Sequence, residues 1–140
     1  MPQFKKKVVL ITGASSGIGE GLAKQFAKQG AQLVLAARRV ENLQKLSDEL
    51  TKQGVETLVC RCDVTFAGDC EKMVESAMQK FGKIDVVVAN AGFGVVGKFE
   101  TLKPEDYRRQ FETNIYGVLN TLYASLNALK ASKGRLALVG

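Results

Sequence analysis

The chain has 140 residues, of which 46% are hydrophobic and 24% charged, proportions typical of a soluble globular protein with one domain. Its net charge is +6, but the lysines are dispersed over predicted helix faces between acidic residues, which argues against nucleic-acid binding. The sequence has no histidine, no zinc-type cysteine spacing and no apolar run of about 18 residues, which excludes a Ser-His-Asp triad and a membrane span and argues against a metal site.

The first predicted element is a strand over the apolar run 8–11, followed by the glycine-rich segment 12–19 and a helical pattern. Gly13 permits a tight turn, Gly17 permits backbone amides to approach a pyrophosphate, and Gly19 permits close packing of the helix against the sheet. The predicted phosphate cradle consists of Gly13, Ser15, Ser16, Gly17, Ile18 and Gly19. The alternative is a glycine-rich turn that binds nothing.

The spacing T-G-x-x-x-G-x-G over residues 12–19 resembles the short-chain dehydrogenase/reductase family. It differs from the common G-x-G-x-x-G fingerprint, and no Gly-Lys-Ser/Thr follows it as in a Walker loop. The resemblance covers nearly all of this chain but only about the first half of a typical member. It implies a Rossmann-type α/β fold, a doubly wound parallel sheet with strand order 3-2-1-4-5, lacking the carboxyl-terminal strands and helices of the full family fold.

The second predicted strand, 32–37, bears on the choice of cofactor. Dinucleotide-binding folds place an Asp or Glu about 20 residues after the glycines, where it bonds the ribose 2′-hydroxyl. This chain has Ala37 there, followed by Arg38 and Arg39. A guanidinium pairs with a 2′-phosphate that a carboxylate would repel, so the prediction is NADP(H) over NAD(H). The alternative is that both arginines lie on a solvated loop.

The third predicted strand, 57–62, runs into Asp63 and Val64. In the resembled family an aspartate at this place bonds the adenine amino group, and the next residue packs along the ring. The alternative for Asp63 is a cap on the following helix. Cys60 and Cys62 alternate along the strand and are expected to face the core.

The fourth predicted strand, 84–89, is nearly all apolar and ends in Asn90-Ala91-Gly92, which matches the N-A-G element of the family. The resemblance implies that this element lies against the inner ribose and nicotinamide side of the cofactor. Asn90 has a structural alternative, in which its side chain ties neighbouring strand ends together. Phe93 then begins a loop toward the expected substrate pocket.

Helices are predicted to end at Gly30, Gly54 and Gly82, and a further long helix begins at Pro104. This helix contains Asn114, which the resemblance assigns a catalytic role, holding a water in the proton relay; the alternative is a solvated amide. Two other amides, Asn120 and Asn127, are interpreted as helix-surface residues. The apolar stripe of the helix is expected to make core or subunit contacts and comprises Leu119, Leu122, Tyr123, Leu126 and Leu129.

The proton-transferring pair of the family, Tyr-x-x-x-Lys, is absent from this sequence, which ends in a predicted fifth strand at 135–140. We therefore expect 1–140 to be an NADP(H)-binding domain truncated after that strand, with its apolar edge exposed and no activity alone. The parent protein is predicted to be a cytoplasmic oxidoreductase acting on a small-molecule carbonyl or alcohol, with no membrane or nucleic-acid partner, homo-oligomeric at full length. The alternatives are a non-catalytic NADP(H)-binding or assembly module and a gene fragment without function.

Overall fold

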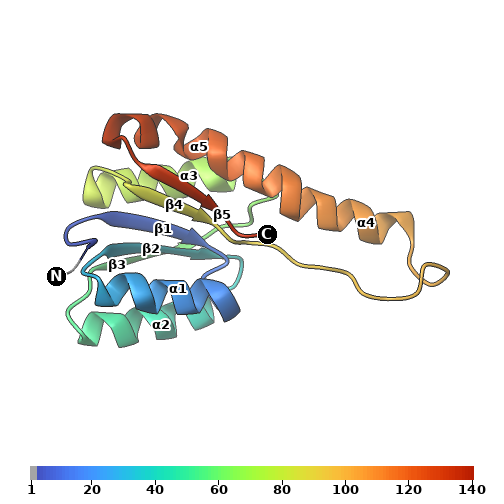
Figure 1. Cartoon of the computed structure of the whole chain (residues 1–140), viewed down its shortest axis with the longest axis horizontal. Coiled ribbons are helices and arrows are strands. Elements are labelled where there is room, and N and C mark those ends of the chain that lie inside the picture. The colour runs from blue at the N-terminus through green and yellow to red at the C-terminus, as the bar shows by residue number, and fades with distance from the viewer. Residues whose placement is uncertain (1–2) are drawn as a thin grey trace.

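Parallel strands with apolar side chains on both faces form the centre of the protein. The computed structural model describes residues 3–140. Its strands are β1 (Val8–Thr12), β2 (Gln32–Ala37), β3 (Thr57–Arg61), β4 (Val86–Ala89) and β5 (Arg135–Leu138). They form a parallel sheet in the order β3-β2-β1-β4-β5 (Figure 1), which confirms the predicted Rossmann-type arrangement.

Helices cover both faces of the sheet. They are α1 (Gly17–Lys28), α2 (Val40–Lys52), α3 (Ala67–Phe81), α4 (Pro104–Phe111) and α5 (Gly117–Ser132), with a π-helical turn, η1 (Glu112–Tyr116), between the last two. The helices α1 and α2 lie on one face, and α3 and α5 lie on the other (Figure 1). Because successive strand residues point to opposite faces, Val8 and Leu10 join the core beneath α3, while Val9 and Ile11 join the core above α1 and α2.

The helix ends follow the predicted signals. Gly30, Gly54 and Gly82 each come just after a helix and adopt positive φ angles of 88°, 86° and 75°, the left-handed conformation that favours glycine. Pro104 begins α4, where the backbone N–H of Lys103 donates to the Asp106 carboxylate over 2.9 Å. This bond, with the hydrogen bond from Arg109, lowers the pKa of Asp106 from its ordinary value.

The predicted single long helix is interrupted, and only part of its apolar stripe lies in the core. The face of α5 that packs on the molecule carries the small residues Gly117, Thr121, Ser125 and Ala128. In contrast, Leu119, Tyr123 and Leu126 are exposed, so they are not core residues. Small side chains permit close approach of α5 to the molecule, and the buried hydroxyls of Thr121 and Ser125 are satisfied by donating to the carbonyls four residues earlier.

Two segments extend from the compact part of the chain. The strand β5 forms the sheet edge, as predicted, and Leu136 and Leu138 on it are exposed. The loop after β4 and the helix α4 reach outward together (Figure 1), and Val96 and Phe99 at the loop are 98% and 88% exposed. No helix among residues 3–140 is long and apolar enough to cross a membrane.

Candidate functional site: a cleft at the carboxyl ends of the strands

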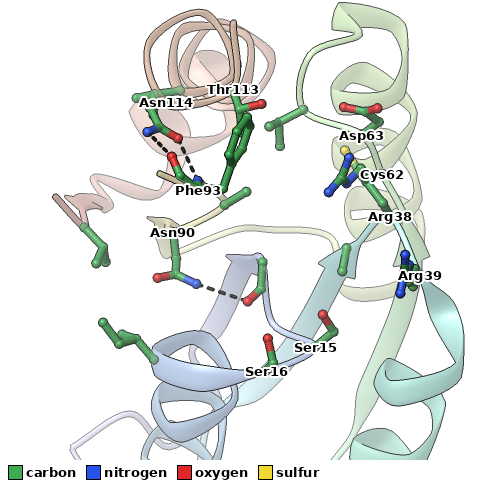
Figure 2. A pocket seen from close by; sticks show the side chains of 18 of the residues that line it. Ser15, Ser16, Arg38, Arg39, Cys62, Asp63, Asn90, Phe93, Thr113 and Asn114 are labelled. Atoms are coloured by element: carbon green, nitrogen blue, oxygen red, sulfur yellow. Dashed lines mark hydrogen bonds between the residues drawn. The ribbon is translucent and has the colours of Figure 1, made fainter. Parts of the chain in front are cut away.

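An open cleft of about 760 Å³ lies where the chain leaves the sheet. Its walls include the residue that directly follows each of four strands: Gly13 after β1, Arg38 after β2, Cys62 after β3 and Asn90 after β4. The strand order reverses between β1 and β4, and ligands of open α/β sheets bind outside the carboxyl ends of the strands at such a point. The cleft is therefore the candidate site, and Figure 2 shows it from close by.

The structure brings together most of the residues that the sequence singled out. Those lining the cleft are Gly13, Ser15, Ser16, Ile18, Arg38, Arg39, Asp63, Val64, Asn90, Ala91, Gly92 and Asn114. Gly17 and Gly19 are not among the lining residues; Gly17 is exposed and Gly19 is buried. Among the other lining residues, Asn42, Thr113 and Val118 were given no role by the sequence interpretation. Ala37 is the position that lacks the ribose-binding carboxylate, Cys62 was expected to face the core, and Val139 and Gly140 belong to the predicted fifth strand.

The glycine-rich turn depends on two different properties of glycine. Gly13 and Gly17 adopt positive φ angles of 62° and 57°, which L side chains rarely adopt. At Gly19 the constraint is space, because a Cβ would overlap the Gly13 carbonyl oxygen and lie 2.6 Å from Asn90 Nδ2. Gly19 thus permits the helix to pack against the turn itself and Asn90.

The first turn of α1 faces the cleft with unused donors. Ser16 is the N-cap residue of α1 and, within residues 3–140, its side chain makes no cap hydrogen bond. The first backbone amides of a helix lack intrahelical partners, and the helix dipole makes this end partially positive. Ser15, Ser16 and these amides therefore offer hydrogen-bond donors to an anion.

Asn90 connects the ends of β1 and β4. Its Nδ2 donates to the carbonyls of Thr12 and Gly13 over 3.2 and 3.1 Å. In return, Thr12 Oγ1 accepts from the backbone N–H groups of Asn90 and Ala91 over 3.0 and 3.1 Å. The Asn90 side chain thus ties the ends of β1 and β4 together, as the structural alternative predicted. The residue also lines the cleft.

The Asp63 carboxylate forms hydrogen bonds within the turn after β3 and does not cap the following helix. Its Oδ1 accepts from the backbone N–H and the hydroxyl of Thr65 over 3.0 and 2.7 Å. The backbone N–H of Asp63 donates to Asp69 Oδ2 over 3.0 Å. Since the N-cap of α3 is Phe66, Asp63 is not the cap of that helix.

Asn120 is a functional candidate that the sequence interpretation missed. We expected it on the helix surface, but it is half-buried, and its Nδ2 donates to the Val64 carbonyl over 2.8 Å. Beside it, a Cβ on Gly117 would lie 2.6 Å from Val64 Cγ2. The helix α5 therefore holds the Val64 segment of the cleft from behind. Asn127 is exposed, as predicted.

Replacement of Asn120 by alanine is expected to lower the free energy of unfolding by about 1 kcal/mol, because the Val64 carbonyl loses its amide donor. The matched control is Asn127→Ala in the same helix, which removes an exposed amide and is expected to change stability by at most about 0.5 kcal/mol. Urea denaturation of both variants measures the difference. Equal stabilities would show that the Asn120 bond contributes nothing.

Asn114 lies in the π-helical turn and fixes the loop after β4. Its Nδ2 donates to the Phe93 carbonyl over 2.7 Å, and its Oδ1 accepts from the Phe93 backbone N–H over 3.0 Å (Figure 2). The amide thus pairs with Phe93 as a neighbouring peptide group would. A Cβ on Gly92 would lie 2.8 Å from Asn114 Oδ1, so the loop approaches the helix closely. Turns of π-helix occur frequently at functional sites.

The arginines after β2 are exposed at the side of the cleft that contains Asp63, opposite Asn114 and Phe93 (Figure 2). Among residues 3–140, neither guanidinium lies within 4.0 Å of a carboxylate. Arg39 is also the N-cap of α2, and Asn42 in the first turn of that helix lines the cleft. Two cations beside a helix N-terminus favour a doubly charged anion.

Metal chemistry has no candidate in the described chain. Within residues 3–140 there is no group of three or more His, Cys, Asp or Glu side chains placed to hold a metal ion. The donors at the cleft are amides, hydroxyls and guanidinium groups, which suit phosphate and ribose oxygens.

This chain is similar in sequence and in fold to known oxidoreductases. The profile of the short chain dehydrogenase family matches residues 7–140. The chain is 43% identical over 130 residues to an uncharacterized oxidoreductase from Listeria innocua, covering 93% of this chain and 52% of that protein. It is similar to an alcohol dehydrogenase from the archaeon Thermococcus sibiricus, complexed with 5-hydroxy-NADP, at TM-score 0.90 and 42% identity, over 94% of this chain and 57% of that one.

A second similar structure contains the other kind of nicotinamide cofactor. The 3-ketoacyl-(acyl-carrier-protein) reductase from Brucella melitensis, complexed with NADH, has a TM-score of 0.85 and 35% identity, over 92% of this chain and 52% of that one. The chain spans about half the length of the curated relatives it matches.

Proposed function

Because this chain belongs to the short-chain dehydrogenase family, we propose that residues 1–140 are the cofactor-binding domain of an NADP(H)-dependent oxidoreductase that interconverts a carbonyl and an alcohol. The nicotinamide, when bound, supplies the hydride acceptor or donor. The residues of this chain contribute binding and orientation. We also propose that the protein acts in the cytoplasm, where cysteines are free thiols except at transiently oxidised sites, and assembles as a homo-oligomer at full length.

The glycine-rich turn fits the pyrophosphate of a dinucleotide. A Cβ at Gly13 would lie 2.9 Å from Ala91 Cα, and one at Gly19 would overlap Gly13, so the turn is packed tightly against the end of β4. This packing fixes the position of the first amides of α1, with the hydroxyls of Ser15 and Ser16 beside them. Amides held in place by a turn bind an anion without further ordering.

The observation that carries the choice of NADP(H) is the sequence Ala37-Arg38-Arg39 at the rim of the cleft. The similar structures hold 5-hydroxy-NADP in one case and NADH in another, so the residues after β2 must decide. Ala37 presents no carboxylate to a ribose 2′-hydroxyl. Arg38 and Arg39 offer paired N–H donors to a 2′-phosphate. Among residues 3–140, no carboxylate forms an ion pair with either guanidinium group.

The two ends of the cleft suit different parts of the nucleotide. Asp63 and Val64 lie on the side of the arginines, and we assign them to the adenine, with the Asp63 carboxylate accepting from its amino group. Asn90, Ala91 and Gly92 lie beside the glycine-rich turn, and we assign them to the inner ribose and nicotinamide. Asn114, opposite the arginines, is the proposed site of a water in the proton relay, and its bonds to Phe93 hold it in place.

The second candidate function is a non-catalytic NADP(H)-binding or assembly module. The comparisons do not favour it, because the curated relatives and solved structures that match this chain are oxidoreductases. On both proposals residues 1–140 bind the cofactor, and turnover of carbonyl or alcohol is expected only from a protein that includes the tyrosine and lysine.

A titration with both cofactors tests the proposed function. We expect NADPH to bind at least roughly tenfold more tightly than NADH, since a charge-assisted hydrogen bond contributes about 1.5–3 kcal/mol and one such bond already exceeds a tenfold difference. The measurement is isothermal calorimetry or cofactor fluorescence at fixed ionic strength. Equal affinities would overturn the NADP(H) assignment, and no binding of either would overturn the nucleotide site.

A further inference from the structure

Two cysteines lie next to one another beneath the cleft. Cys62 directly follows β3, and Cys70 lies in the amino-terminal half of α3. Their sulfur atoms are 3.9 Å apart, and the residues are only 2% and 0% exposed. Both are free thiols. The fold of the β3–α3 connection thus brings together two thiols that are eight positions apart in the sequence.

One contact of Cys70, the hydrogen bond from the Cys62 thiol, favours the Cys70 thiolate over that of Cys62. Two other contacts suit the protonated thiol: the Cys70 Sγ donates to the Val64 carbonyl oxygen over 3.8 Å and lies 3.9 Å from Thr121 Oγ1, whose own hydroxyl donates to the Gly117 carbonyl. A hydrogen bond from the Cys62 thiol lowers the pKa of Cys70, although burial opposes this. The same hydrogen bond, together with burial, raises the pKa of Cys62.

Only one of the two thiols is reached from the cleft. Cys62 lines the cleft directly beside Asp63, and Figure 2 shows its side chain between those of Asp63 and Arg38. Cys70 lies behind it in the apolar core. Cys60, two residues earlier on the same strand face, is buried but does not line the cleft.

We propose that Cys62 and Cys70 form an oxidisable dithiol, a modification site that small disulfide molecules reach through the adenine side of the cleft when no nucleotide is bound. Cys62 is the thiol that lines the cleft, so it makes the first attack, and its raised pKa makes this step slow. After losing its proton, the Cys62 sulfur attacks one sulfur of the small disulfide, forms a mixed disulfide and releases the first small thiolate. The Cys70 thiolate then attacks the Cys62 sulfur, breaks the mixed disulfide and releases the second. The two cysteines lose two electrons and two protons, and the small disulfide becomes two thiols.

Formation of this bond changes the cleft. The sulfur atoms must approach from 3.9 Å to about 2.05 Å, so one side or both must move by a total of about 1.9 Å. Cys62 is bonded directly to Asp63, and Cys70 contacts the Val64 carbonyl, so the movement displaces the segment that we assign to the adenine. This part of the inference rests on the proposed function. If the disulfide lowers the affinity for the nucleotide by some factor, bound nucleotide lowers the equilibrium constant of disulfide formation by the same factor.

The test treats the full-length reduced protein with oxidised glutathione, with and without NADPH, and identifies the products by mass spectrometry of peptides. We expect a peptide pair joined through Cys62 and Cys70. NADPH at about 100 times its Kd is expected to slow the reaction by roughly tenfold or more. Cys60→Ser is the matched control and reacts like the original protein. Cys70→Ser accumulates glutathione on Cys62, and Cys62→Ser forms neither product.

Separate outcomes judge the two proposals. Calorimetry first establishes whether NADPH binds, and circular dichroism establishes that each protein is folded. If the folded protein keeps Cys62 and Cys70 as free thiols in excess oxidised glutathione, the dithiol inference is overturned. If NADPH binds but oxidation is equally fast with it, entry through the cleft is overturned. If NADPH does not bind and the disulfide still forms, the dithiol stands and the proposed function fails.

Discussion

Replacement of both Arg38 and Arg39 by glutamine is expected to weaken NADPH binding by roughly 100-fold or more and to leave NADH binding within about threefold. The two guanidinium groups are exposed at the rim of the cleft and, within residues 3–140, have no carboxylate partner. Each charge-assisted bond to a phosphate contributes about 1.5–3 kcal/mol, and 1.4 kcal/mol corresponds to a factor of ten. NADH lacks the 2′-phosphate and therefore loses little. The measurement is a titration of the original protein and of the double variant with NADPH and with NADH.

Two controls separate local pairing from overall charge. The variant Lys72→Gln/Arg108→Gln also lowers the net charge from +6 to +4 by neutralising two exposed cations outside the cleft. It is expected to bind NADPH as the original protein does, apart from a small salt-dependent change. Arg38→Lys keeps the charge but not the planar pair of donors, so an intermediate loss is expected. An equal loss of NADPH and NADH affinity in the arginine variant would contradict the 2′-phosphate assignment.

Gly19→Ala is expected to abolish measurable nucleotide binding and to lower the free energy of unfolding by about 1–3 kcal/mol. The added Cβ would overlap the Gly13 carbonyl oxygen and approach Asn90 Nδ2 to 2.6 Å. One of these atoms belongs to the backbone of the turn that presents the amides, so relief of the overlap must displace the cradle. Urea denaturation measures the stability, and a titration with NADPH measures the binding.

Gly21→Ala is the matched control in the same helix. Apart from the chain neighbours and the backbone of α1 itself, no heavy atom of residues 3–140 lies within 4 Å of a Cβ built at Gly21. The substitution is therefore expected to stabilise α1 by about 1 kcal/mol through its helix propensity and to leave binding unchanged. If Gly19→Ala bound NADPH as tightly as Gly21→Ala, the close packing of α1 against the turn would be irrelevant to the site.

The local patterns of this chain predict its architecture well because they report on backbone geometry. Apolar runs of strand length, separated by helical patterns that end in glycine, indicate alternating β and α elements. Short crossovers then require parallel strands with helices on both faces. The spacing at residues 12–19 locates the glycine-rich turn, and most of the predicted site residues line one cleft because parallel strands place their carboxyl ends at one edge.

Side chains on one helix face show what such patterns omit. Leu119, Tyr123 and Leu126 are apolar and exposed, whereas Thr121 and Ser125 are polar and buried. A hydropathy pattern assigns the leucine face of the helix to the core. It does not show that small side chains permit close packing, or that buried hydroxyls can donate to carbonyls of their own helix. Asn114 likewise pairs with Phe93, twenty-one residues away, in a π-helical turn that a repeat of 3.6 residues cannot reveal.

The strand order followed from the family resemblance at residues 12–19. The sequence by itself determined the glycine-rich turn, the ends of the helices and the presence of arginines instead of a carboxylate after β2. These features depend on residue type and local spacing. Only the tertiary structure decided which of two similar amides matters, Asn120 or Asn127, and that Cys62 and Cys70 lie 3.9 Å apart. Such contacts depend on how elements pack on one another, and the distance between packed surfaces is set by the whole core rather than by any one segment.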